Sequence, residues 1–506
     1  MTTQERQAYV FPMASAQQRL WFLEQLAPGS PLYHLASLLE VTGPLAPAAL
    51  ERAVNDVIAR HESLRTAFAM LDDQPMQLVS GSGAITVLVH DFSAELDPAA
   101  RRARALSAAR ARCQQPFDLS KGPLLRVELF QLAPQHHLLM VVMHHIVSDG
   151  WSLAVFVQEM TQLYQAHSTG GRADLAALPI QYADYANWQR EHLTGPVLDE
   201  HLAFWREQLR GAPALLDLPT DRPRPAVQRF RGSVLEFAIP EPLVERLRRL
   251  CQQTKTTPFM LLLGVFAALL GRYSRQQDLV LGTPIANRNR AETAALIGFF
   301  VNTLALRVRL EDDPSLFLLL DRVRQLSLAA HAHQDLPFEH VVTAQNPERN
   351  LSHAPVFQVM FAYQNVPEQP LAAAGLALTP LAFDDGTAKF DLTLFVEERG
   401  RQLTGRLEYD LDLFDAATIA RLRDHLLVLL THALDYPTRP LSQLPLLPPD
   451  EQRRLLVEWN QTQAEYPRAA TLHQLFEEQA ARSPAAVALR WNDATLTYAE
   501  LDDRAS

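Results

Sequence analysis

The chain has 506 residues, of which 48% are hydrophobic and 20% charged, and it carries a formal net charge of −11 at pH 7. This length exceeds one ordinary domain, and the composition is typical of well-packed globular domains. The acidic balance, without any block of basic residues, argues against a nucleic-acid partner or an anionic membrane surface.

Cysteine content and apolar runs narrow the class further. Cys113 and Cys251 are the two cysteines, which is too few for a disulfide framework or a cysteine metal site. The first residues lack the cationic and then apolar pattern of a secretory signal. The longest apolar run, residues 259–270, is too short to cross a bilayer. We therefore expect a soluble, cytoplasmic protein in a reducing compartment.

The first part of the chain, to about residue 175, has a mixed α/β pattern. Apolar residues at helical spacing predict two helices, and the first has a predicted buried stripe of Leu20, Trp21, Leu23 and Leu26. Short runs rich in Val, Leu and Ile predict strands. The predicted helices span residues 15–26 and 47–68, and the predicted strands span residues 35–41, 85–91, 124–132 and 137–146.

The second part, residues 176–445, has a similar pattern and begins in a stretch rich in glycine and proline. One long apolar run predicts a helix, and three shorter runs predict strands. The predicted helix spans residues 257–273, and the predicted strands span residues 233–239, 279–283 and 303–310. A linker over residues 446–470 and the start of another α/β pattern over residues 471–506 complete the predicted organisation.

One stretch, residues 143–152, carries the strongest candidate chemistry. It follows an apolar run typical of a buried strand and precedes a predicted helix, which Ser148 or Asp149 can cap. Neighbouring residues of a strand face opposite ways. We therefore do not expect His144 and His145 to act as two equivalent ligands.

The residue types in this stretch suit proton transfer. His145 can accept a proton near neutral pH and return it. Asp149 can orient that imidazole or can hold the loop by pairing with an arginine, and Gly150 would let the chain turn sharply into the helix. The plain alternative is a strand end followed by a capped helix, as we expect around His136 and His137. Zinc is a weaker alternative, because adjacent strand residues diverge and no His-x3-His or cysteine cluster supports it.

The His-His-x3-Asp-Gly pattern at residues 144–150 resembles the core signature of the condensation domains of nonribosomal peptide synthetases. Companion motifs follow in the order expected for that family. They lie at residues 14–23 (with Ala14 where a serine is usual), 60–68, 182–190, 297–303 followed by Arg307, 333–339 and, more weakly, 347–350. Together the motifs cover roughly residues 11–445.

The resemblance implies an α/β (α+β) fold with two lobes, each similar to chloramphenicol acetyltransferase, in a V-shaped pseudo-dimer with a tunnel between them. The first lobe would span residues 1–175 and the second residues 176–445. Residues 446–470 would be a linker, and residues 471–506 the truncated N-terminal start of an adenylation domain. Donor and acceptor thioesters on phosphopantetheine arms would enter the tunnel from opposite faces.

The resemblance also assigns roles to residues of the signature. His145 matches the catalytic histidine of the family, and His144 matches a supporting one. Asp149 matches an aspartate that pairs with an arginine, which favours that role over orienting the imidazole. Arg288 is the expected partner of Asp149, and Arg65 is the second candidate.

Gly150 completes the supporting structure that the resemblance implies. Four further residues are candidates for lining the donor, or acyl, channel: Ser148, Trp151, Ser152 and Asn302. Each buried methylene is worth about 0.8 kcal/mol, so channel volume would decide the accepted acyl length. A bulky residue at position 148 is expected to shorten the accepted chain, unless Ser148 is only a helix cap.

The implied reaction is attack of a carrier-bound aminoacyl amine on an acyl thioester, which gives an amide and releases a thiol. No intrinsic cofactor and no metal are implied, because phosphopantetheine arrives on partner carriers. The expected partners are an aminoacyl-loaded peptidyl carrier, an acyl-CoA or acyl carrier protein, and an adenylation domain downstream in the same synthetase. The chain itself is expected to be a monomer.

The position of the opening motif favours one subtype. Only about ten residues precede it, which favours a starter domain that N-acylates the first amino acid with a fatty acyl group from acyl-CoA (lipoinitiation). An elongating domain with an L-peptidyl carrier donor is the first alternative. A catalytically inactive scaffold that docks carriers is the second, and the intact signature argues against it.

Overall fold

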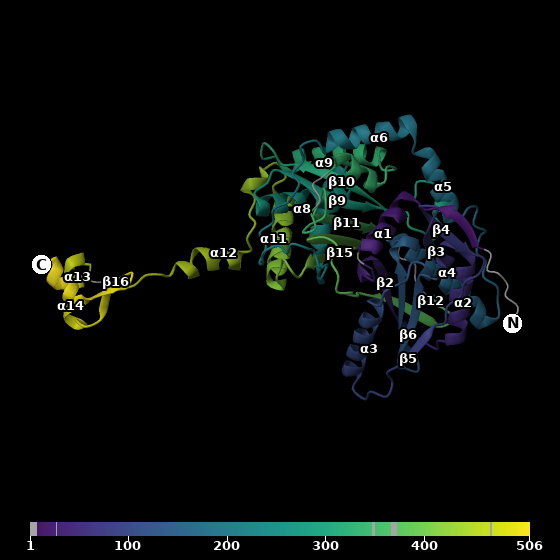
Figure 1. The fold of residues 1–506 in the computed structure, drawn as a ribbon, viewed down its shortest axis with the longest axis horizontal. Coiled ribbons are helices and arrows are strands. Elements are labelled where there is room, and N and C mark those ends of the chain that lie inside the picture. Colours follow the sequence, from purple (N-terminus) through teal and green to yellow (C-terminus); the bar gives the residue numbers. More distant parts are fainter. Residues whose placement is uncertain (1–7, 27, 347–349, 366–371, 466–467) are drawn as a thin grey trace. The chain divides into compact units, whose positions relative to one another are not determined.

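The computed structural model describes residues 8–26, 28–346, 350–365, 372–465 and 468–506. Residues 347–349, which make up most of the weakest companion motif, lie outside these ranges. The chain separates into two compact units, Met1–Leu446 and Leu447–Ser506. Figure 1 shows the first unit built from sheets with helices packed along them.

The first six-stranded sheet has the order β12-β13-β2-β7-β6-β5 and is buried on both faces. Alternate strand residues serve the two faces, as the pleat requires. Leu139 and Val141 of β7 pack with helices α2 and α4, whereas Leu138 and Met140 pack with α3. These elements are β2 (His34–Thr42), β5 (Leu88–Asp91), β6 (Leu125–Ala133), β7 (His136–His144), β12 (Ala372–Ala373), β13 (Leu376–Leu381), α2 (Pro47–Arg60), α3 (Pro98–Cys113) and α4 (Gly150–Thr169).

The second predicted lobe contributes a strand to the sheet of the first. β13 belongs to the second predicted lobe by sequence, yet it pairs antiparallel with β2 at the edge of the first sheet. The pairing runs from Ala377 opposite Thr42 to Leu381 opposite Leu38. The second lobe is thereby tied through backbone hydrogen bonds to the sheet that carries the histidine pair.

The predicted helix over residues 47–68 is wrong in its last turns. Helix α2 ends at Arg60, and residues Glu62–Arg65 form a 3-10 turn. The helix ends there because His61 adopts an extended backbone and its buried imidazole contacts the Glu159 carboxylate at 2.8 Å. The chain then enters β3 (Thr66–Leu71), which forms a three-stranded sheet with β4 (Gln74–Ser80) and β1 (Ala8–Pro12).

Helix α1 (Ser15–Leu26) is confirmed, but its predicted buried stripe is only partly present. Leu20 is buried, whereas Leu26 is 66% exposed. Three further helices come later in the chain than α4. They are α5 (Tyr182–His192), α6 (Gly195–Gln208) and α10 (Phe338–Gln345).

The second six-stranded sheet, in the order β10-β9-β11-β14-β15-β8, carries the largest apolar core. The four predicted elements of this part are confirmed within about two residues as β8, α8, β9 and β10. The strands are β8 (Gly232–Ile239), β9 (Asp278–Ile285), β10 (Asn302–Arg309), β11 (Val359–Asn365), β14 (Leu392–Arg399) and β15 (Gln402–Asp410). The helices that pack on this sheet are α7 (Glu241–Thr254), α8 (Pro258–Ser274), α9 (Leu316–Ala332) and α11 (Ala416–Asp435).

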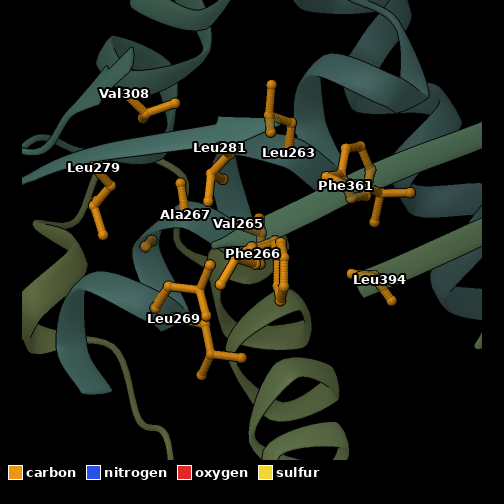
Figure 2. Packing of buried hydrophobic residues seen from close by; sticks show 14 of the residues in the cluster. Leu263, Val265, Phe266, Ala267, Leu269, Leu279, Leu281, Val308, Phe361 and Leu394 are labelled. Atoms are coloured by element: carbon orange, nitrogen blue, oxygen red, sulfur yellow. The ribbon is translucent and has the colours of Figure 1, made fainter. Parts of the chain in front are cut away.

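Helix α8 lies at the centre of this core, as Figure 2 shows. The Thr257 hydroxyl caps its start by accepting from the Met260 N–H at 3.2 Å, and Pro258 occupies the first turn. Its eleven residues from Leu261 to Gly271 are all buried. A helix that is apolar on every side must be covered on every side, and α7, α9 and α11 supply that cover together with the sheet.

The second unit contains α13 (Leu472–Arg482), β16 (Val487–Trp491), β17 (Ala494–Thr497) and α14 (Tyr498–Ala505). A short helix, α12 (Pro449–Leu456), occupies part of the predicted linker. Within the described ranges, no single helix is long and apolar enough to cross a membrane, and the pair α7 and α8, which passes that test together, bends by 106° at its break.

Candidate active site

The histidine pair lies where strand β7 of the first sheet turns into helix α4. The strand ends at His144, two residues earlier than predicted, and His145–Val147 form a single 3-10 turn. Asp149 is the N-cap of α4, and its carboxylate accepts from the Ser152 N–H at 2.8 Å. Of the two caps expected from the sequence, Asp149 is therefore the one used.

The ring of His145 is held in one orientation by the loop that follows it. Its Nδ1 lies 2.9 Å from the backbone oxygen of Ser148. A carbonyl oxygen only accepts, so Nδ1 carries the proton and donates it, which leaves the lone pair of Nε2 free. The ring also meets Phe299 edge to face, with centroids 4.8 Å apart. This geometry presents a proton acceptor in a fixed direction.

The surroundings of His145 keep the imidazole unprotonated. Burial lowers its pKa well below the usual 6.5, and the positive charge of Lys389 lowers the pKa further. At neutral pH the ring is therefore a free base. A neutral imidazole with an available lone pair is what general-base catalysis requires.

His144 occupies a different environment and faces away from solvent. Its Nδ1 accepts from the Ile146 N–H at 3.1 Å, so it fixes the start of the 3-10 turn. Burial lowers its pKa to about 3, with smaller contributions from His34 and Lys389. His34 lies beside it, with ring centroids 6.0 Å apart, and donates from Nδ1 to the backbone oxygen of Cys113. His144 has almost no exposed surface to offer a substrate.

The buried histidines make the fold sensitive to acid. Burial lowers the pKa of His34 to about 4, whereas an unfolded histidine titrates near 6.5. The unfolded chain therefore binds more protons as the pH falls from about 6.5 to about 4, and stability falls with it. Urea titrations at pH 7 and pH 4.5 give the decrease in the free energy of unfolding between these pH values. We expect this decrease to be about 2–3 kcal/mol smaller in His34→Leu than in the wild type. Equal decreases in the wild type and His34→Leu would contradict this assignment. So would an equally reduced decrease in His473→Leu, which replaces an exposed histidine.

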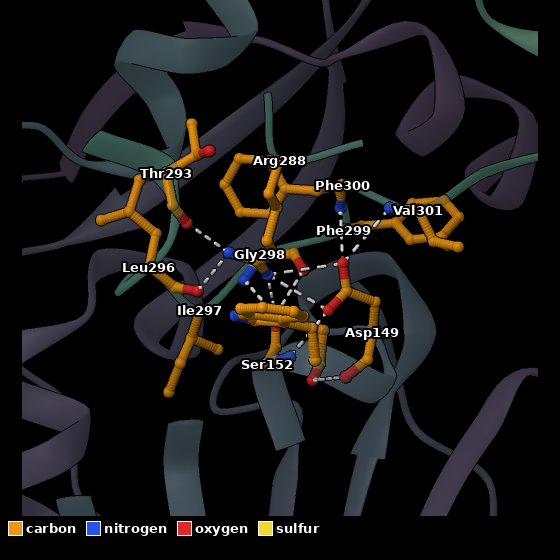
Figure 3. A network of polar contacts seen from close by, with 12 residues as sticks. Asp149, Ser152, Arg288, Thr293, Leu296, Ile297, Gly298, Phe299, Phe300 and Val301 are labelled. Atoms are coloured by element: carbon orange, nitrogen blue, oxygen red, sulfur yellow. Dashed lines mark hydrogen bonds and ion pairs between the residues drawn. The ribbon is translucent and has the colours of Figure 1, made fainter. Parts of the chain in front are cut away.

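Asp149 holds the active-site turn against the second lobe through a buried ion pair, drawn in Figure 3. Arg288 Nη2 lies 3.2 Å from Asp149 Oδ1, and each side chain is only 2% exposed. The backbone N–H groups of Phe300 and Val301 donate to Asp149 Oδ2 at 3.0 and 3.2 Å. The expected pairing of Asp149 with Arg288 is thus present, and the Asp149 carboxylate is occupied by these donors rather than by the imidazole of His145.

Ser152 and three backbone carbonyls complete this network. Arg288 donates to the Ser152 hydroxyl at 2.7 Å, to the Leu296 oxygen at 2.8 Å and to the Thr293 oxygen. The same hydroxyl donates to the oxygen of Gly298 at 2.8 Å and accepts from its N–H at 3.0 Å. The network joins α4 of the first lobe to the loop before β10 of the second. Burial lowers the pKa of Arg288, and the charge of Asp149 opposes that effect.

Two expected supporting residues differ from their sequence interpretation. Arg65 does not contact Asp149; it donates to the backbone oxygen of Ser80 and lies 3.4 Å from the Glu62 carboxylate. Gly150 is not needed for a sharp turn, because its φ is not positive and an added Cβ would meet no atom within 4 Å. The turn is made instead by the extended backbone of Asp149, with φ −137° and ψ −179°.

Three of the four expected channel residues offer no accessible lining. Ser148 and Ser152 are fully buried, and the Asn302 amide donates to the backbone oxygens of Gln334 and Leu336 at 2.8 and 2.7 Å. The Ser152 and Asn302 side chains join separate segments of the fold, whereas the buried Ser148 hydroxyl lies 3.4 Å from the backbone oxygen of the adjacent Asp149. Trp151 is 47% exposed, and its indole donates to the Ala294 oxygen at 2.9 Å.

Sequence reasoning missed two charged residues of the second lobe: Lys389, which acts on His145, and Glu408, which acts on Lys389. Lys389 lies between β13 and β14, and Glu408 lies on β15. Neither belongs to a companion motif. A usable signal was the scarcity of lysine, because the chain has three lysines among 46 Lys and Arg residues. Among the residues that the structure describes, no group of three or more His, Cys, Asp or Glu side chains is placed to hold a metal ion.

Comparison with known proteins agrees with this geometry. The model of one protein family, described as the condensation domain, matches residues 7–456. Malpibaldin synthetase of Mortierella alpina is 41% identical over 494 residues, which are 97% of this chain and 9% of that protein. Phosphinothricin tripeptide synthetase PhsC of Streptomyces viridochromogenes is 44% identical over 499 residues, which are 98% of this chain and 46% of that protein. The chain thus spans less than half the length of both relatives.

One solved structure extends the similarity to the fold. A four-domain nonribosomal peptide synthetase, holo-AB3403 bound to AMP and glycine, superimposes with a TM-score of 0.86 at 24% identity. The match covers 99% of this chain and 38% of that one. At this identity the likeness concerns the fold, and it agrees with the two-sheet α/β architecture described above.

Proposed function

The chain belongs to the condensation-domain family, and from this membership we propose that it joins a carrier-bound amine to a thioester-bound acyl group as an amide. The observation that carries the proposal is the fixed, unprotonated imidazole of His145, with Nδ1 bound to the Ser148 oxygen at 2.9 Å and Nε2 free. Burial and the charge of Lys389 both lower the pKa of His145 and so favour the free base.

The proposed step balances without a cofactor. The amine nitrogen attacks the thioester carbonyl carbon, the C–S bond breaks, and a thiolate leaves. An α-amine has a pKa near 8, so an appreciable fraction is already neutral at pH 7. Once the C–N bond forms, the attacking amine nitrogen is positively charged, and its N–H becomes strongly acidic. Even a weak base such as His145 can then take that proton. The thiolate then recovers a proton, and the imidazole returns to its free form.

The identity of the donor is the finer part of the proposal. Similarity to a tripeptide synthetase favours a peptidyl or aminoacyl group on a carrier domain, the elongating alternative. The starter role with an acyl-CoA donor stays a prediction. A scaffold that only docks carriers would not need a base with a fixed tautomer, and we set that alternative aside.

Partners follow from the same chemistry. A peptidyl carrier would present the amine on phosphopantetheine, a second carrier or acyl-CoA would present the thioester, and an adenylation domain would load the acceptor. No cofactor of the chain's own enters the proposed step. A monomer in the cytoplasm is the setting that we propose for this reaction.

One experiment tests the function and separates the donors. The purified chain is mixed with an aminoacyl-loaded carrier and with either a peptidyl-loaded carrier or acyl-CoAs of several lengths, and products are identified by mass. Amide formed only from the carrier donor supports elongation, and amide formed from acyl-CoA supports the starter role. No amide from any donor, with loaded carriers verified by mass, would refute the proposed function.

A further inference from the structure

Lys389 is a partly buried lysine of the second lobe. Its Nζ lies 5.3 Å from the ring centroid of Tyr33, a cation–π contact. No hydrogen bond or ion pair of this ammonium is present among the described residues. The other lysines differ: Lys121 is largely exposed and paired with Asp118, and Lys255 is exposed. Burying even part of a cation without a direct ion pair costs free energy.

The backbone holds Lys389 rigidly in place. On one side the Ala388 N–H donates to the Phe230 oxygen at 3.0 Å, and on the other the Asp391 N–H donates to the Gln358 oxygen at 3.0 Å. The Asp391 carboxylate also accepts from Arg224 at 2.8 Å. The anchored backbone fixes where the Lys389 side chain begins, and the cation–π contact with Tyr33 defines where its ammonium lies.

This position is next to the active-site turn. Tyr33, over which the ammonium lies, packs against the same buried cluster as Phe299, and that cluster includes Ile146 and Val147. Phe299 in turn meets the His145 ring edge to face, with centroids 4.8 Å apart. Tyr33 also directly precedes His34, which pairs with His144 across β2 and β7, with ring centroids 6.0 Å apart. The ammonium over Tyr33 is therefore close to the strand end from which the 3-10 turn starts.

The charge of Lys389 acts on several histidines of the first lobe. Among the charges that lower the pKa of His145, that of Lys389 is the largest, and it also lowers the pKa of His144 and His34. The charged groups that face Lys389 are Glu408, Asp385 and Arg19.

Glu408 is the counter-charge with a titration near neutral pH. Its neighbours Leu407 and Tyr409 belong to the helix-covered core, so Glu408 lies on the other face of the second sheet. Burial raises its pKa to about 7, and Asp385 raises it further, whereas Arg406 and Lys389 lower it.

We propose that Lys389 is a positioning residue of the proposed condensation site: its ammonium, held against Tyr33 beside the catalytic turn, adds to the effect of burial in keeping His145 in the free-base form, and Glu408 modulates that effect. The inference deepens the proposed function and rests on it, because a free imidazole matters if His145 takes the amine proton. Its electrostatic part can be measured without any reaction.

The direct test is histidine NMR on the full chain, with the His145 signal assigned by its loss in His145→Gln. In the wild type we expect His145 to stay unprotonated near neutral pH, and its titration is followed down to the lowest pH at which the chain stays folded. Lys389→Met should raise its pKa by about one unit, since a neighbouring like charge is removed. Lys389→Arg should restore the wild-type behaviour, and Lys255→Met should leave it unchanged. An identical His145 titration in Lys389→Met and the wild type would overturn the proposal.

Glu408→Gln provides a second, independent readout with the opposite sign. Removing the counter-charge leaves the ammonium unscreened above pH 7, so the His145 pKa should fall or stay below the measured range. If Lys389→Met fails to fold, Lys389→Gln and Glu408→Gln still decide the question. A rise of the His145 pKa in Glu408→Gln would count against the proposal.

A condensation assay over a range of pH distinguishes a failure of this inference from a failure of the proposed function. Lys389→Met should keep amide formation at pH 8 and lose it several-fold more steeply than the wild type below pH 6.5, and Lys389→Arg should follow the wild type. If no variant forms amide from any donor, the proposed function fails while the NMR result still stands. If amide forms with the same pH profile in Lys389→Met and the wild type, the inference fails while the function stands.

Discussion

His145→Ala is expected to lower the rate of amide formation by roughly 10²- to 10⁴-fold, the range that a positioned general base contributes. The reason is geometric: the Ser148 oxygen fixes the tautomer at 2.9 Å, so the lost Nε2 acceptor has no substitute in the same orientation. The measurement is single-turnover condensation with both carriers loaded. The melting temperature should change little, because His145 makes one hydrogen bond and one ring contact.

The second His-His pair of the chain provides a matched control for this prediction. His136→Ala alters the chain's other His-His pair, at the far end of the same strand, where the ring contacts Glu40 at 2.7 Å. It should leave the rate unchanged. A loss of only a few-fold in His145→Ala would mean that holding the two tethered substrates together supplies most of the acceleration.

How far the sequence predicts this site depends on whether a contact is local. The His-His-x3-Asp-Gly spacing identifies His145, and the strand before it is predicted because both faces of that strand are apolar. The tautomer of His145 is not predictable from spacing, since it depends on the backbone carbonyl of Ser148, which the 3-10 turn brings within hydrogen-bonding distance of Nδ1. Single turns of this kind leave no periodic signal.

Long-range contacts account for most of the remaining differences. Leu64 continues the helical spacing of the predicted helix over residues 47–68 and is buried with it, yet it lies in a 3-10 turn after His61. The strand β13 is short, and its partner β2 lies more than 300 residues earlier, so no local sequence pattern predicts their pairing. Lys389 lies over the ring of Tyr33, a contact between residues far apart in the sequence. Propensity cannot convey such tertiary constraints.

Buried polar positions are harder to assign from sequence than apolar ones for a related reason. Small polar residues near a catalytic motif suit the lining of a channel, which is the role expected of Ser152 and Asn302. In the structure both side chains form hydrogen bonds to backbone groups of distant segments. A buried hydroxyl or amide must find partners inside the protein, and which partners it finds depends on the second lobe.

The buried pair of Asp149 and Arg288 should be the most costly interaction to break in the first unit. Asp149→Ala is expected to lower the free energy of unfolding by about 3–5 kcal/mol, because it leaves the guanidinium of Arg288 buried without its counter-charge. It also removes the acceptor of the Phe300, Val301 and Ser152 N–H groups. Urea denaturation followed by fluorescence measures the change.

The controls for this prediction separate a buried pair from an exposed one. Asp321→Ala breaks the exposed pair with Arg324, whose side chains are 49% and 39% exposed, and should cost less than about 1 kcal/mol. Removing both members in Asp149→Ala/Arg288→Met should recover part of the loss, since no uncompensated charge then remains buried. If Asp149→Ala costs no more than Asp321→Ala, the pair does not hold the lobes together. Condensation activity should then survive Asp149→Ala, whereas a structural pair predicts that activity falls together with stability.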